Sequence, residues 1–161
     1  MKNPFAFVWL AALLAPLSLA SFVPAAAARP VYVGVDGGHV AVSGYDTVSY
    51  FDGAGVPVKG DAAFAVEHDG AVYHFANAAN AARFAADPDA FMPRYGGHCA
   101  WAMARGYLAP GDPLAYAIVD GRLYLNFNQA VKAKWDIDRA GYIAAAEKNW
   151  AAMPDDAKFG G

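Results

Sequence analysis

Alternating apolar residues on both sides of Asp69-Gly70 predict a β-hairpin over residues 63–75. Asp-Gly is typical of the two-residue type I′ turn, whose twist matches that of the flanking strands. With this turn, Phe64 is expected opposite Phe75, at the far end of an apolar face. His74 then lies on the other face of the hairpin.

A second hairpin is predicted over residues 114–127, around Asp120-Gly121. Leu114 is expected opposite Phe127, and the face that they share is apolar throughout. The intervening residues of the second strand, Arg122, Tyr124 and Asn126, are expected to point away from that face.

Residues with helical spacing lie between and after the hairpins. Asn77 is expected to cap a helix through Ala86 that Asp87-Pro88 ends, and Asn128 and Asp138 to cap two later helices. The pattern predicts a small single α+β domain with two antiparallel β-hairpins in a sheet packed against several short helices. No internal repeat is evident in the sequence.

The first 28 residues have the order of a cleaved secretory signal. A basic residue, Lys2, precedes an apolar stretch, and small residues follow at positions 25–28. Pro16 interrupts the stretch, which is shorter than the roughly 20 apolar residues of a spanning helix. We therefore expect one domain over residues 29–161, a periplasmic or secreted location, and no stable membrane insertion after cleavage.

Charge and motifs exclude several classes of function. The formal net charge is −3, with 12 basic and 15 acidic residues. The basic residues are scattered, so no nucleic acid partner is expected. The sequence has no nucleophile elbow, zinc-ligand spacing, phosphate loop or dinucleotide fingerprint, so nothing points to a hydrolase, kinase or dehydrogenase.

Short motifs are spread over residues 40–150. In chain order they are Gly44-Tyr45-Asp46, Val48, Tyr50-Phe51, Tyr73, Phe75, Asn80, Phe84, Asp87-Pro88, Tyr95-Gly96-Gly97, Cys99-Ala100, Asp120-Gly121 and Leu123-Tyr124-Leu125-Asn126. Together they resemble the exported YHS-domain-containing proteins of bacteria. The resemblance implies a small metal-binding module, with copper as the usual suggested ligand. Metal-binding members carry two cysteines where this chain has Ala76 and Asn80, so a copper site here must use other residues.

Cys99 is the single cysteine, so the chain can form no internal disulfide. Three interpretations stay open. Cys99 is a small buried residue, or a reactive thiol near a helix N-terminus with His98 as proton acceptor. As the third interpretation, it is a soft Cu(I) ligand with Met103 four residues later and His98 or His74 completing the site.

Three functions follow from these interpretations. The first is an exported binding module for a metal ion or small ligand, with copper as the first ligand to test. The second is a thiol-based redox protein that uses Cys99, and the third is a structural or partner-binding module without catalysis. Whether the protein is an enzyme stays open, and the sequence identifies no protein partner.

Overall fold

A computed structural model describes residues 30–34, 38–53 and 56–158. The predicted signal sequence, residues 1–28, lies outside these described residues. Within them, no helix combines the length and the apolar character needed to cross a membrane.

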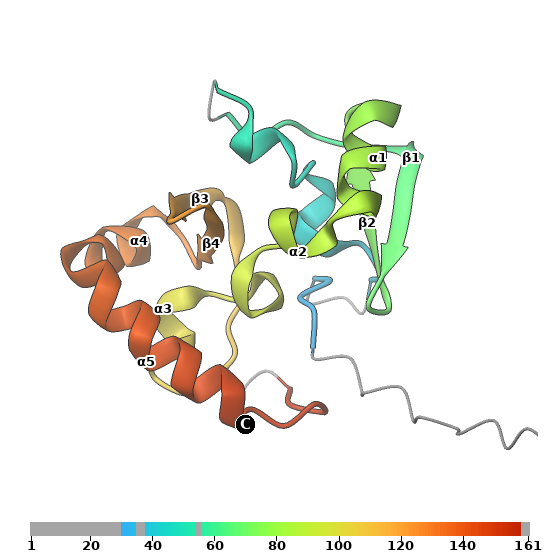
Figure 1. Ribbon diagram of the computed structural model, residues 1–161. Helices are drawn as coiled ribbons and strands as arrows, with labels where there is room; N and C mark the ends of the chain where they lie inside the picture. The colour runs from blue at the N-terminus through green and yellow to red at the C-terminus, as the bar shows by residue number, and fades with distance from the viewer. Residues whose placement is uncertain (1–29, 35–37, 54–55, 159–161) are drawn as a thin grey trace, which may run out of the picture.

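Both predicted hairpins are present, and with the helices they form a small α+β domain (Figure 1). The first consists of β1 (Asp61–His68) and β2 (Ala71–Phe75), the second of β3 (Asp112–Val119) and β4 (Arg122–Asn126). Each hairpin forms an antiparallel two-stranded sheet of its own. The residues of both Asp-Gly turns have positive φ, as a type I′ turn requires.

The pairing expected at the far ends of the hairpins is wrong. Phe75 pairs with Asp61 rather than with Phe64, because the register shifts between Asp61 and Ala65. The second hairpin shifts in the same way, so Leu114 does not pair with Phe127.

The cause is an aspartate at the start of each long strand. Asp61 accepts a hydrogen bond from the backbone N–H of Ala63, and Asp112 from that of Leu114, both at 2.8 Å. An N–H group bonded to a nearby side chain is not available to the partner strand. The strands therefore begin with an irregular turn, and regular pairing starts several residues later.

The helices begin where the sequence predicts. Asn77, Asn128 and Asp138 each accept a hydrogen bond from the backbone N–H three residues later, at 2.9 Å. The α-helices are α1 (Ala78–Ala86), α2 (Pro88–Phe91), α3 (Ala100–Met103), α4 (Gln129–Trp135) and α5 (Arg139–Ala152). Short 3-10 segments are η1 (Ala41–Gly44), η2 (Ser49–Phe51), η3 (Arg94–Gly97) and η4 (Asp136–Asp138).

The chain contains a structural repeat that its hydrophobic pattern does not predict. The first unit, residues 40–91, and the second unit, residues 93–138, each have a 3-10 segment with three successive positive φ values, a short helix, a hairpin and an Asn-capped helix. The strands match in length, with eight residues and then five in both hairpins. Figure 1 shows the two hairpins in different parts of the molecule, each with its own helix.

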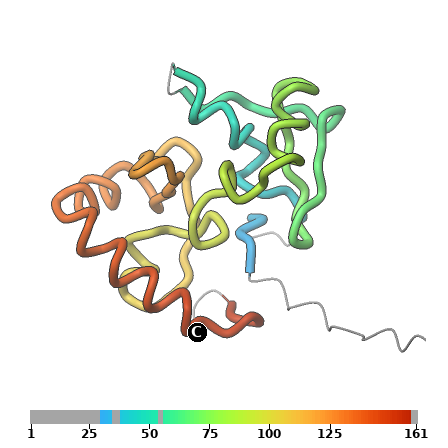
Figure 2. The backbone as a smooth tube through the Cα atoms, in the orientation of Figure 1, coloured from blue at the N-terminus to red at the C-terminus, as the bar shows by residue number. Residues whose placement is uncertain are grey.

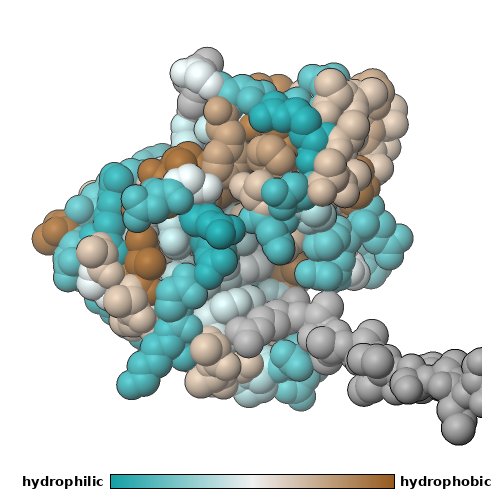
Figure 3. Space-filling model, viewed as in Figure 1, coloured by the Kyte–Doolittle hydropathy of each residue, from teal (hydrophilic) through white to brown (hydrophobic). Residues whose placement is uncertain are grey.

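The hydrophobic core has two clusters, one for each unit, and they meet at β4. Leu123 and Leu125 of β4 belong to the cluster of the first unit, and Tyr124 to the cluster of the second. Tyr124 faces away from Leu123 and Leu125, as the sequence predicts, but this second face of β4 is buried as well. Helix α5 packs against α3 (Figure 2). The face of the molecule drawn in Figure 3 is largely hydrophilic, with separate apolar patches.

Candidate functional site

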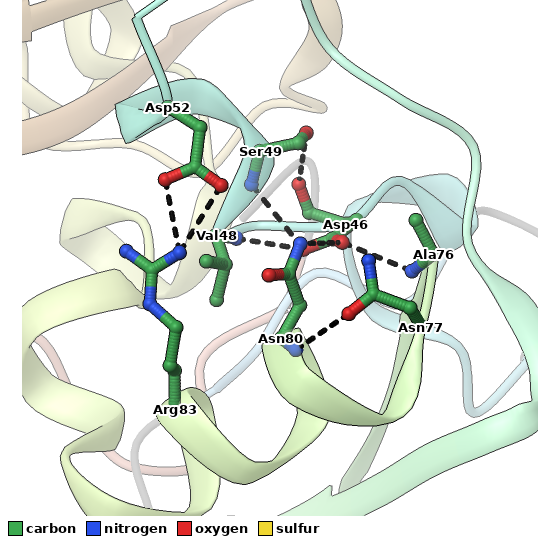
Figure 4. A network of polar contacts seen from close by, with 8 residues as sticks. All are labelled: Asp46, Val48, Ser49, Asp52, Ala76, Asn77, Asn80 and Arg83. Atoms are coloured by element: carbon green, nitrogen blue, oxygen red, sulfur yellow. Dashed lines mark hydrogen bonds and ion pairs between the residues drawn. The ribbon is translucent and has the colours of Figure 1, made fainter.

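The first unit is organised around the carboxylate of Asp46, which is completely buried. One carboxylate oxygen accepts hydrogen bonds from the backbone N–H groups of Val48 and Ser49. The other accepts from the N–H of Ala76, at 2.9 Å, and from the side-chain amide of Asn80, at 2.7 Å (Figure 4). Four donors thus satisfy the carboxylate, so Asp46 is a structural acceptor. Ala76 and Asn80 both serve this network.

Cys99 occupies the place in the second unit that Asp46 has in the first. Both residues follow a run of three positive φ values, and both backbone N–H groups bond the loop before the hairpin, at Val58 O and Ala109 O. The thiol accepts a hydrogen bond from the N–H of Phe127, at 3.2 Å, as Asp46 accepts one from Ala76. The two units therefore place backbone N–H donors at corresponding positions around different acceptors.

Val131 is the residue that makes the two sites differ. In α1, Asn80 is the third residue after the cap Asn77, and its amide reaches Asp46. In α4, Val131 holds the same position after the cap Asn128. The isopropyl group of Val131 cannot donate a hydrogen bond to Cys99. Instead, a pocket of about 220 Å³ lies beside Cys99. The lining residues are Cys99, Trp101, Ala102, Tyr107, Ala109, Phe127 and Val131.

Cys99 lines this pocket, although the residue is only 1 % exposed. Burial raises the pKa of the thiol, and hydrogen bonds from the backbone N–H groups of Ala102, Phe127 and Trp101 partly oppose that effect. Cys99 also precedes the first residue of α3, as the sequence predicts. The net direction is opposite to the acidification that a helix N-terminus alone would give, so the sulfur is a neutral thiol at pH 7.

His98 and Met103 are close to Cys99 in sequence, but neither lines the pocket. His98 is buried, its Nδ1 lies 2.8 Å from the backbone oxygen of Tyr95, and its ring packs near Tyr32 and Trp150. Burial lowers the pKa of His98, so its imidazole is neutral at pH 7. Met103 is fully buried in the cluster of the second unit.

His74 lies on β2 in the first unit, beside Gly44 and Gly60. It is therefore part of the other hairpin, away from the pocket that Cys99 lines. Within the described part of the chain, no group of three or more His, Cys, Asp or Glu side chains is arranged to hold a metal ion. Of the four residues proposed as metal ligands, Cys99 alone lines the pocket.

Sequence reasoning missed the other residues around the thiol. Trp101, Phe127 and Val131 have the pattern of core residues, and nothing in their spacing marks a pocket. The signal that could have found them is the recurrence of Gly-Asp, Asp-Gly and Asn at matching places in the two units. Aligned on these residues, Asn80 falls on Val131 and Asp46 comes close to Cys99.

Comparison with protein families, with curated proteins and with solved structures found no match for this chain. The resemblance to YHS-domain proteins, the exported location and the proposed functions therefore stay predictions.

Proposed function

We propose that this protein is a binding module for a small ligand, which enters the pocket beside Cys99. The observation that carries the proposal is the pocket itself, an apolar space of about 220 Å³ with Cys99 among its lining residues. An apolar cavity of about 150 Å³ in another protein binds benzene, so this space is sufficient for one aromatic ring or a short aliphatic chain. It is smaller than the pockets of drug-sized ligands.

The comparison of the two units supports this function. Asn80 donates to the buried acceptor of the first unit, whereas Val131 at the matching position borders open space. Tyr107 and Phe127 also line the pocket, and both are unusually exposed for large apolar side chains, at 42 % and 50 %. Exposed aromatic residues around an apolar pocket are typical of a ligand site.

Titration with benzyl alcohol, followed by ¹H–¹⁵N NMR, tests the proposal. We expect saturable shift changes centred on Cys99, Trp101 and Phe127. Val131→Trp fills the pocket and is expected to abolish these changes. Val56→Trp places the same side chain at an exposed site in the first unit and is expected to leave them intact. Absence of binding, or shifts centred on other residues, would contradict the proposal.

Copper(I) is the second candidate ligand. Its support is Cys99 among the lining residues of the pocket, because sulfur is a ligand that Cu(I) prefers. Met103 lies one helical turn later, but its side chain is buried in the cluster of the second unit, so copper binding requires it to turn toward Cys99. Cu(I) titration against a competing chelator tests this candidate. Copper binding requires that Cys99→Ser and Met103→Leu each weaken the affinity, and unchanged affinity in both variants would reject it.

A further inference from the structure

Basic side chains without an acidic partner lie beside the pocket. The guanidinium carbon of Arg105 is 3.4 Å from the ring centroid of Trp101, and the Lys134 Nζ is 6.0 Å from it. Trp101 lines the pocket, so both cations lie near one of its lining residues. Arg105 bonds only the backbone oxygen of Trp101, and none of the ion pairs among the described residues involves Arg105 or Lys134.

Two other basic residues, which are not beside this ring, share one acidic partner. Lys132 and Arg139 both pair with Asp136, at 2.7 and 2.8 Å. Arg105 and Lys134 are thus two like charges near one aromatic ring, and no ion pair of the described residues neutralises either of them. Like charges repel, and an anion placed between or beside them would remove that repulsion.

The polar groups left without partners around the pocket are donors as well. Among the described residues, the Trp101 indole Nε1 and the Asn126 amide Nδ2 are buried and have no hydrogen-bond partner. Asn126 is fully buried, and its Oδ1 lies 3.9 Å from the Cys99 sulfur. A ligand that suits the Trp101 indole and the two cations supplies acceptors and negative charge, while its apolar part suits the pocket.

We propose, on the basis of the proposed function, that the ligand is a small monocarboxylate with an apolar body, such as a single aromatic ring or a short aliphatic chain. The apolar body lies against Cys99, Phe127 and Val131, and the carboxylate lies at the Trp101 side, within reach of Arg105 and Lys134. The pocket volume sets the size of the body, and the unpaired cations set the charge of the head.

Benzoate and benzyl alcohol, which differ mainly in charge, separate this inference from the function on which it rests. We expect benzoate to bind the full chain about tenfold more tightly than benzyl alcohol at low ionic strength, and this preference to shrink as salt is added. Arg105→Gln and Lys134→Gln are each expected to weaken benzoate several-fold and to leave benzyl alcohol unchanged. Arg83→Gln, which removes a cation of the first unit that pairs with Asp52, is expected to change neither affinity.

The outcomes are distinct. Equal affinity for the two probes, or benzoate binding that survives the loss of both cations, would overturn the carboxylate inference while the pocket remains a ligand site. Failure of both probes to bind would overturn the proposed function together with the inference. Unchanged benzyl alcohol binding also shows that each variant is folded.

Discussion

At the scale of single residues, the structure separates an acceptor that stabilises the fold from one that borders a pocket. Asp46 is surrounded by four N–H donors, and each of its oxygens accepts two of them. Cys99 has donors in corresponding positions but one side of its surroundings is open. We therefore expect substitutions at Asp46 to affect stability and those around Cys99 to affect binding.

Asp46→Asn tests the structural role. In the variant, an amide NH₂ group replaces one of the two carboxylate oxygens. Whichever way the amide is turned, the two N–H groups that donated to that oxygen then face another donor. Charge-assisted hydrogen bonds contribute about 1.5–3 kcal/mol each, so we expect a loss of about 3 kcal/mol in the free energy of unfolding. Asp52→Asn is the matched control, because Asp52 pairs with Arg83 at the surface (Figure 4). That change is expected to cost less than about 1 kcal/mol in urea unfolding, and equal losses would reject the account.

Cys99 gives a prediction about pH. Because burial raises the pKa of the thiol, the folded protein keeps the proton at pH values where the unfolded chain, with a pKa of about 8.5, loses it. The contribution of this buried thiol to the free energy of unfolding is complete below the pKa of the unfolded chain and is lost as the pH rises above it. Urea unfolding between neutral and alkaline pH should show this decline, and Cys99→Ala should reduce it.

Iodoacetamide labelling checks the same shift independently. The reagent needs the thiolate, so the folded protein should react more slowly than the denatured chain at neutral pH. If the pH midpoint of labelling in the folded protein lay below the pKa of an ordinary thiol, the direction of the shift would be contradicted. Such a result would favour the thiol-based redox function instead.

At the scale of elements, the sequence predicts turns and caps well and strand ends poorly. Asp-Gly turns and Asn or Asp caps act through the backbone within a few residues, so their effect can be recognised locally. The bulges depend on Asp61 and Asp112 removing an N–H from the ladder, an effect that alternating hydrophobicity does not reveal. The pairing of Phe64 with Phe75 was wrong for this reason.

The correspondence between the units predicts that Cys99→Asp is tolerated. A carboxylate at position 99 would meet the N–H donors of Trp101, Ala102 and Phe127, as Asp46 meets those of Val48, Ser49 and Ala76. We expect a loss of about 1–2 kcal/mol, since Val131 adds no donor. Met103→Asp is the control, because it buries a carboxylate in an apolar cluster and should cost more than about 4 kcal/mol. Thermal unfolding compares them, and equal destabilisation would contradict the correspondence.

At the scale of the whole molecule, two similar units share one strand. Leu123 and Leu125 of β4 pack on the first unit while Tyr124 packs on the second, so neither cluster is closed without β4. The repeat is hard to see in the sequence because the core residues at matching positions differ, as with Phe75 and Asn126. The pocket could not be predicted for a related reason, since it depends on the contrast between Asn80 and Val131 across the two units.

The most direct test of the central claim is a crystal structure of the protein soaked with a brominated benzyl alcohol. The anomalous signal of bromine locates the ligand without reference to its orientation. Our account predicts one bromine peak in the pocket, among Cys99, Phe127 and Val131, and its loss in Val131→Trp. A peak in another part of the molecule, or none in crystals of the wild type, would contradict the assignment of this pocket as the binding site.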